Sequence, residues 1–331
     1  MRLGGRAAYL TNVADREQLK GAIDWARQRR LPVLMIGHGS NIIWKDSGFD
    51  GLVICNRILH YKEEPIGDGA DSTVLIKIGA GENWDKVVER TVSRGLTGIE
   101  ALSLIPGTAG ATPVQNVGAY GQEIRDTLVD IEVHDSRTGE FVVIKQGDCG
   151  FGYRTSRFKT IDRGRFYITM ITLKLQRGKP VPPFYPALQS YLVDHGIVNP
   201  TPHEIRNAVI ATRQAKLPDP VLVPNCGSFF ANPVIKETEY AKLQATYPDL
   251  PNWPVGDGKV KIPAAWLIEQ AGLKGFHDTK LGIATWAKQP LVLTNRGAET
   301  SQQLLAFRDK IIHIVYVAFS VSLEQEPELL P

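Results

Sequence analysis

The chain has 331 residues, of which 43% are hydrophobic and 22% charged, with 38 basic and 35 acidic side chains. This length predicts two or more domains, and the hydrophobic content excludes a disordered chain. The balanced charge excludes a basic footprint for nucleic acid or a membrane, and no apolar run approaches the ~20 residues of a membrane span. Three cysteines without metal-ligand spacing, and no signal-peptide pattern at the N-terminus, indicate a cytoplasmic protein without a metal site.

The first half of the chain predicts mixed helices and strands. Asp15 is suited to cap a helix that runs to about Arg30, and a buried strand at 32–36 leads directly into Gly37-His38-Gly39-Ser40-Asn41. Residues 135–139 give a hairpin signal between two strands. The other elements predicted here are strands at 52–55, 74–78, 129–134, 140–145 and 166–175, and helices at 83–93 and 202–215.

The second half begins at a rigid connector. Lys216-Leu217-Pro218-Asp219-Pro220 contains two prolines and is the best candidate for a domain boundary. The elements predicted beyond it are helices at 236–247, 264–271 and 301–313, and strands at 291–294 and 317–323.

Two glycine-rich stretches are candidates for a ligand site. Residues 37–41 combine glycines with Ser40 and Asn41, and consecutive backbone N–H groups in such a turn can bind an anion. Residues 95–121 hold six glycines among small and amide side chains, with little helix or strand periodicity. Tight turns between short strands would explain either stretch alone. The pair favours loops that wrap an extended diphosphate cofactor.

Other chemistries find little support in the sequence. The third glycine of a dinucleotide-binding fingerprint is absent, because Ile42 stands there, and no phosphate loop, zinc-protease or hydrolase motif is present. Ser228 follows a glycine and precedes two phenylalanines, but no histidine lies nearby to activate it as a nucleophile. Cys226 has no activating partner and is expected to be a packed side chain, and a solvated basic loop is an alternative for residues 153–158.

Seven segments together, in this order, resemble the UDP-N-acetylenolpyruvoylglucosamine reductases of peptidoglycan synthesis, in their longer, type I form. The segments are 36–41, 103–121, 151–159, 216–220, 227–233, 263–275 and 323–327. The resemblance implies an α+β fold, with a two-lobed FAD-binding region of the vanillyl-alcohol-oxidase type followed by a smaller α+β substrate-binding domain. The implied divisions are lobe 1 at 1–56, lobe 2 at 57–215, the substrate domain at 216–318 and a returning tail at 319–331.

The resemblance also implies non-covalent FAD, with its diphosphate on residues 37–41 and its flavin ring near 105–111 and 115–120. The implied cofactor contacts are Gly37, His38, Gly39, Ser40, Asn41, Ile105, Pro106, Gly107, Thr108, Gly110, Ala111, Gln115, Asn116, Gly118, Ala119, Tyr120 and Arg213.

The implied reaction is the NADPH-dependent reduction of UDP-N-acetylglucosamine enolpyruvate by a monomeric enzyme. Arg154, Ser228 and Glu326 match the family's catalytic positions, and Glu324 and Glu328 remain alternatives for the third. The residues that match substrate-contact positions are Tyr185, Lys216, Asn232 and Gln289.

The chain departs from the family pattern at two further places. His38 stands between Gly37 and Gly39, where the family commonly has a glycine that makes three in a row. The chain also begins inside the family's first strand, over residues 1–10. Two other functions therefore stay open. An oxidase with flavin bonded to His38 would leave the denatured, precipitated protein yellow, whereas a UDP-sugar-binding protein without flavin would be colourless and would not regain colour with added FAD.

Overall fold

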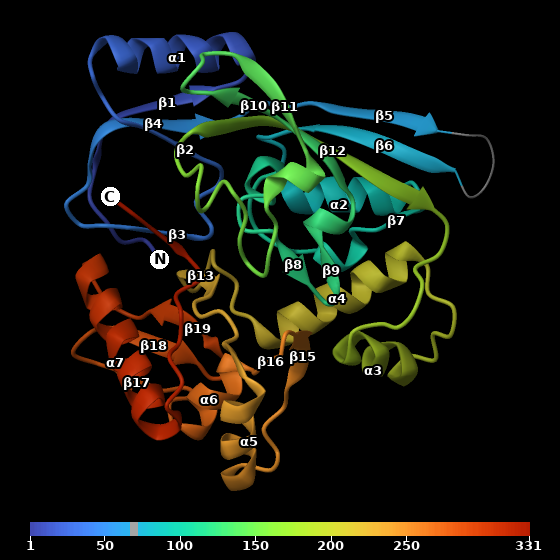
Figure 1. The fold of residues 1–331 in the computed structure, drawn as a ribbon, viewed down its shortest axis with the longest axis vertical. Coiled ribbons are helices and arrows are strands. Elements are labelled where there is room, and N and C mark those ends of the chain that lie inside the picture. Colours follow the sequence, from blue (N-terminus) through green and yellow to red (C-terminus); the bar gives the residue numbers. More distant parts are fainter. Residues whose placement is uncertain (67–71) are drawn as a thin grey trace. The chain divides into compact units, whose positions relative to one another are not determined.

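The computed structural model describes residues 1–66 and 72–331, and the chain divides into two compact units. The larger unit comprises residues 7–40 and 49–213, and the smaller unit comprises residues 1–6, 41–48 and 214–331. Figure 1 traces both units in sequence colours. The division into four parts, at 56, 215 and 318, stays a prediction.

A three-stranded parallel sheet begins the larger unit. Its order is β1 (Ala7–Val13), β4 (Phe49–Asn56) and β2 (Val33–Ile36). Helix α1 (Arg16–Gln28) packs its buried stripe, which includes Leu19 and Ile23, in the same hydrophobic core. The Asp15 side chain accepts a hydrogen bond from the Gln18 N–H at 2.8 Å, which confirms the predicted N-cap.

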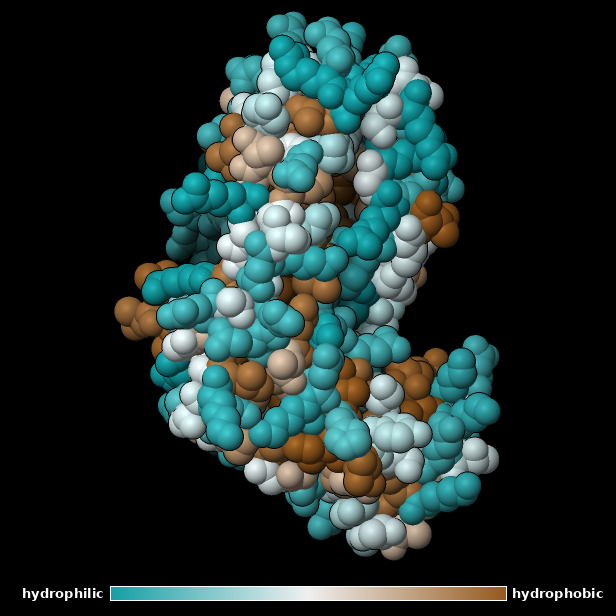
Figure 2. All heavy atoms as spheres, turned by 90° about the vertical axis from the view of Figure 1, so that its left-hand side faces the viewer, coloured by the Kyte–Doolittle hydropathy of each residue, from teal (hydrophilic) through white to brown (hydrophobic). Residues whose placement is uncertain are grey.

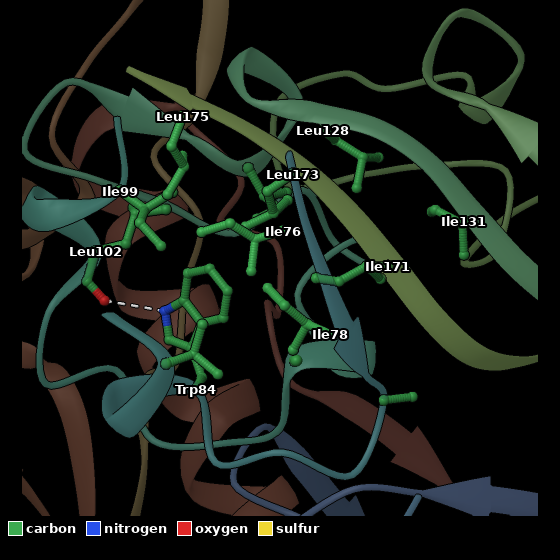
Figure 3. Close-up of a cluster of buried hydrophobic side chains, with 14 of the residues drawn as sticks. Ile76, Ile78, Trp84, Ile99, Leu102, Leu128, Ile131, Ile171, Leu173 and Leu175 are labelled. Carbon is green, nitrogen blue, oxygen red and sulfur yellow. Dashed lines mark hydrogen bonds between the residues drawn. The ribbon is translucent and has the colours of Figure 1, made fainter. Parts of the chain in front are cut away.

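An antiparallel sheet forms the main core of the larger unit. Its order is β11 (Phe141–Lys145), β10 (Leu128–Asp135), β12 (Phe166–Arg177), β6 (Thr73–Gly79) and β5 (Tyr61–Ile66), with β7 (Leu96–Thr97) also paired to β12. Helix α2 (Trp84–Ser93) begins with the fully buried Trp84, whose Nε1–H donates to the Leu102 carbonyl at 3.0 Å (Figure 3). The Asp135–Gly139 hairpin is confirmed by the antiparallel pairing of β10 with β11.

Shorter elements complete the larger unit. They are β8 (Gly118–Ala119), β9 (Gln122–Glu123), α3 (Pro186–Asp194), most of α4 (Pro202–Lys216) and the 3-10 turns Glu100–Leu102, Ala109–Ala111, Ile124–Asp126 and Gln146–Cys149. The α4 helix starts as its sequence predicts, because the Glu204 N–H donates to Thr201 Oγ1 and the Thr201 N–H donates to Glu204 Oε2.

The smaller unit combines small sheets and helices around one core. The first sheet has the order β13 (Asn225–Ser228), β19 (Gln289–Asn295), β18 (Ile283–Trp286) and β17 (His277–Asp278). The second has the order β14 (Val234–Lys236), β16 (Lys259–Lys261) and β15 (Trp253–Gly256). In the third, β20 (Glu328–Leu330) pairs in parallel with β3 (Ile42–Trp44). The helices are α5 (Glu237–Thr246), α6 (Ala264–Gln270) and α7 (Ser301–Phe319). Phe229, Phe230 and Phe307 are among the core side chains.

The predicted strand at 317–323 is wrong. Residues 317–319 form the last turn of α7, which extends six residues beyond the predicted end at 313. Ile311, Val315 and Phe319 are buried at four-residue spacing, which is a helical and not a strand repeat. Ser320 ends the helix in the left-handed region, with φ of 56°, and its N–H donates to the Tyr316 carbonyl at 2.8 Å.

Over residues 1–66 and 72–331, no helix is both long and apolar enough to span a membrane. Hydrophilic side chains cover most of the face that Figure 2 shows, with hydrophobic ones between them. Within the same part of the chain, no three His, Cys, Asp or Glu side chains are grouped to hold a metal ion.

His134 predicts a loss of stability in acid. Its side chain is 1% exposed, and Nδ1 has no hydrogen-bond partner within the described chain. Burial lowers the pKa of His134 and Arg27 assists, while Asp24, a hydrogen bond with the Gly139 backbone and Asp135 oppose the shift. In acid, the His134 imidazole therefore binds a proton more readily in the unfolded chain than in the folded one. The free energy of unfolding should fall as the pH drops below about 6.5.

Urea unfolding at several pH values measures this effect. The His134→Phe variant should lose less stability than the wild type between about pH 6.5 and pH 5, because the ring no longer titrates. The exposed His203, replaced with Asn, is the control. An unchanged pH dependence in His134→Phe would contradict the assignment.

Candidate active site

The two glycine-rich loops contact each other in the larger unit. Ser40 Oγ donates to the Pro106 carbonyl at 2.9 Å. A Cβ on Gly37 would lie only 2.3 Å from Thr108 Oγ1, so the contact requires glycine at this position. The sequence predicts that both loops bind one cofactor. In the structure, residues 37–40 and 105–108 contact each other.

The loop at 105–111 is also anchored to the start of α2. The Ala109 N–H donates to the Glu82 carbonyl at 2.9 Å, and the Gly110 N–H donates to the Ala80 carbonyl at 3.0 Å. The Trp84 N–H donates back to the Gly107 carbonyl at 3.1 Å. The loop is therefore held on both sides of its glycines.

Backbone strain gathers around these loops. The described chain has eight non-glycine residues with positive φ, and four of them belong to the candidate site or border it. They are Leu104, Asn116, Tyr120 and Arg154, with φ between 48° and 56°. Such conformations cost on the order of 1–3 kcal/mol each and persist only where surrounding contacts hold them.

Arg213 offers a buried donor. Its Nε has no hydrogen-bond partner within the described residues, although the guanidinium shares a hydrogen bond with the Tyr120 hydroxyl. Burial lowers the pKa of Arg213, while Tyr120 and Asp85 oppose the shift. The Tyr120 ring also meets the Tyr185 ring edge to face, with centroids 5.6 Å apart. Three residues predicted to bind cofactor or substrate thus form one cluster.

Asp85 and Arg206 support this cluster and were missed from the sequence. Arg206 donates to both carboxylate oxygens of Asp85, at 2.6 and 3.1 Å, and the Leu104 N–H donates to Asp85 at 2.5 Å. Burial raises the pKa of Asp85, but these hydrogen bonds outweigh it and hold the pKa below its usual value. The only sequence signal was an acidic residue in the first turn of a predicted helix.

His38 lies exposed in the first glycine loop. Partial burial of its imidazole, and next the charge of Arg57, lower the pKa of His38. The shift favours the neutral form of the ring.

Arg154 occupies a tight turn in the larger unit. The Gly152 and Thr155 backbones exchange hydrogen bonds at 3.1 and 3.3 Å around it. Its Nη2 donates to the Gly118 carbonyl at 2.8 Å. The guanidinium is thus fixed beside the second glycine-rich stretch.

The C-terminal tail pairs with the segment that follows Ser228 in the smaller unit. The Ala231 N–H donates to the Glu324 carbonyl at 3.0 Å, and the Glu326 N–H donates to the Phe229 carbonyl at 2.9 Å. Glu326 therefore lies opposite the residue directly after Ser228. Glu328 instead lies in β20, which pairs with β3.

Ser228 ends strand β13, where the pairing with β19 is irregular. Gly227, with φ of 77°, turns the backbone just before it. Cys226 is buried, as expected for a packed side chain. Burial raises the pKa of the Cys226 thiol to about 12, and the negative charge of Glu326 adds to the shift.

The remaining predicted substrate contacts in the smaller unit have local partners. Asn232 Oδ1 accepts the Ala264 N–H at 3.0 Å and so caps α6. The Lys216 carbonyl accepts the Trp286 indole N–H at 3.0 Å, and Lys216 is exposed. Gln289 begins β19. Their contacts with substrate stay predictions.

Gly37→Ala tests the contact between the loops. The new methyl group would overlap Thr108 Oγ1, so we expect the free energy of unfolding to fall by about 1–3 kcal/mol and FAD retention to weaken. Adding Thr108→Ala should restore the free energy of unfolding, because it removes the overlapping Oγ1 and Cγ2 atoms. Gly21→Ala is the control, since nothing lies within 4 Å of that site in α1 and the change should be neutral or stabilising. Failure of Thr108→Ala to rescue the variant would refute the steric account.

Comparisons with known proteins agree with this geometry. The sequence pattern described as an FAD binding domain matches residues 7–145, and that described as the UDP-N-acetylenolpyruvoylglucosamine reductase C-terminal domain matches residues 219–330. The reductase of Chromobacterium violaceum is 40% identical over 98% of this chain and 94% of its own length. The reductase of Pseudomonas aeruginosa is 39% identical with the same coverage.

A solved reductase structure, from Thermus caldophilus, matches 97% of this chain and 92% of its own, with a TM-score of 0.64 and 23% identity. This likeness supports the fold, and the predicted α+β class with an FAD-binding region is confirmed. The chain therefore belongs to the UDP-N-acetylenolpyruvoylglucosamine reductase family of FAD-dependent oxidoreductases.

Proposed function

We propose that this protein reduces UDP-N-acetylglucosamine enolpyruvate to UDP-N-acetylmuramate, with NADPH as reductant and FAD as cofactor, in the synthesis of peptidoglycan precursors. Relatives that carry the reductase name cover nearly the whole chain. The observation that carries the proposal is the pairing of the tail with residues 229–231, because it places Glu326 beside the Ser228 segment.

The larger unit suits non-covalently bound FAD. The glycine at 37 lets backbone approach closely, and the buried Nε–H of Arg213 is a donor in need of an acceptor. The proposed cofactor contacts are the residues already named from the family resemblance in the two glycine loops, with the exception of Asn116, together with Tyr120 and Arg213. When bound, FAD supplies the hydride, taken from NADPH, that reduces the vinyl group.

The substrate is an enol ether conjugated to a carboxylate. Hydride addition at its terminal carbon moves negative charge onto the carboxylate. We assign Arg154, as a cation, and Glu326, as a protonated acid, to stabilise that charge. Ser228 then donates its hydroxyl proton to the α-carbon, which completes the two new C–H bonds. Lys216 and Tyr185 would hold the diphosphate and the sugar, with Asn232 and Gln289 as further substrate contacts.

Separate half-reactions test the function and the role of Ser228. Anaerobic NADPH should bleach the wild-type flavin, and UDP-N-acetylglucosamine enolpyruvate should then restore its colour. In Ser228→Ala the bleaching should be unchanged, while the reoxidation rate falls by about a hundred- to ten-thousandfold because the proton donor is missing.

Ser93→Ala, an exposed serine in the last turn of α2, is the control and should behave as the wild type. Equal loss of both half-reactions in Ser228→Ala would show that Ser228 is not the proton donor. A wild-type flavin that stays bleached with this substrate would refute the proposed function.

The register of the tail predicts which carboxylate acts. Glu326→Gln should slow reoxidation by about a hundred- to a thousandfold, because an amide is a much weaker hydrogen-bond donor to the developing charge than a protonated carboxyl group. Glu324→Gln should leave the rate unchanged, since Glu324 is exposed and its pairing uses only backbone atoms. Stopped-flow absorbance gives both rates. A larger loss in Glu324→Gln or Glu328→Gln than in Glu326→Gln would contradict the assignment.

A further inference from the structure

Three side-chain hydrogen bonds join residues 114–118 to the turn at 152–156 within the larger unit. They run from Ser156 Oγ to the Val114 carbonyl at 2.6 Å, from Asn116 Nδ2 to the Gly152 carbonyl at 3.0 Å, and from Arg154 Nη2 to the Gly118 carbonyl at 2.8 Å. Two segments about 40 residues apart in sequence are thereby joined in both directions, because donors come from each of them.

Asn116 has no side-chain donor left for a ligand. The residue is fully buried, and Nδ2 donates to Glu123 Oε2 at 2.8 Å as well as to the Gly152 carbonyl. An amide nitrogen carries two protons, so these two contacts use both. Its Oδ1 accepts the Arg125 N–H at 3.3 Å. The predicted contact between this side chain and the cofactor thus has no donor to make it.

Ser156 fixes the other end of the turn. It is 1% exposed, and its Oγ accepts the Phe158 N–H at 3.2 Å while donating to Val114. Both hydrogen bonds are therefore internal to the protein. The Ser156 hydroxyl therefore stabilises the backbone conformation of the turn that contains Arg154.

The Arg154 side chain depends on this framework. Its backbone has a φ of 56°, a conformation that a non-glycine residue leaves unless contacts hold it. A Cβ on Gly118 would lie 3.3 Å from Arg154 Nη1, so the guanidinium lies closely against this glycine. Loosening the turn would move the guanidinium away from the Gly118 carbonyl.

We propose that Asn116 and Ser156 are positioning residues, which act on the reaction only by holding Arg154. The inference rests on the proposed function, because it takes Arg154 to be the group that stabilises charge on the substrate. For Asn116, the inference assigns a role in the geometry of Arg154 in place of the cofactor contact that the family resemblance implies.

A double-mutant cycle tests the inference in the reoxidation half-reaction. Asn116→Asp keeps the size of the side chain but removes both donors. In an otherwise wild-type chain it should slow reoxidation by about ten- to a hundredfold, the cost of misplacing a reacting group by about 1 Å. In an Arg154→Ala background it should have no further effect, because the residue through which it acts is gone.

FAD affinity, from the quenching of flavin fluorescence, and bleaching by NADPH should be unchanged in Asn116→Asp. Asn207→Asp, an exposed asparagine on α4, is the matched control. Ser156→Ala is carried through the same cycle, so that the inference stays testable if Asn116→Asp does not fold. An equal rate loss in both backgrounds, or weaker FAD binding with normal reoxidation at saturating FAD, would overturn the inference.

A crystal structure of the variant separates this inference from the proposed function. The inference expects the hydrogen bond between Arg154 and Gly118 to be broken in Asn116→Asp, whether or not the enolpyruvyl substrate reoxidises the wild-type flavin. An Arg154 side chain that keeps its place there would overturn the inference and leave the proposed function intact.

Discussion

At Gly37 and Gly110 the backbone of the larger unit lies so close to the Thr108 and Ala80 side chains that a Cβ at either glycine would overlap them. A Cβ on Gly37 would lie 2.3 Å from Thr108 Oγ1, and one on Gly110 would lie 2.4 Å from the Cβ of Ala80. These contacts fix the loop at 105–111 against the first glycine loop and against the start of α2. The proposed cofactor site depends on them, because backbone N–H groups serve a diphosphate only where the chain itself comes close.

Polar side chains around this site mostly hold the backbone in place. The Asp85 carboxylate accepts hydrogen bonds from the Arg206 side chain and the Leu104 N–H. Asn116 and Ser156 hold the turn that contains Arg154. Several of these backbones are strained, and strain of this kind needs partners that over-determine the conformation. Many polar side chains at the site therefore stabilise its backbone and are not themselves ligand contacts.

In the smaller unit, the tail carries three glutamates that are candidates for the family's third catalytic position. Glu324, Glu326 and Glu328 alternate along an extended chain, so their spacing alone selects none of them. In the backbone pairing the Glu326 N–H donates to the Phe229 carbonyl, and on this basis we propose Glu326 as the carboxylate that acts. A shift of this register by two residues would bring a different carboxylate to the Ser228 segment.

The sequence by itself determined the local features and the family. The Asp15 cap, the hairpin at 135–139 and the two glycine clusters are short-range signals, and the order of seven motifs identified the reductases. It failed at 317–323, where a short apolar run fits a strand or a buried helix equally well until packing decides. Tertiary structure alone decided the pairing of Asp85 with Arg206, the hydrogen-bond partners of the Asn116 side chain and the register of the tail. Each of these depends on partners far apart along the chain, whose meeting no local pattern records.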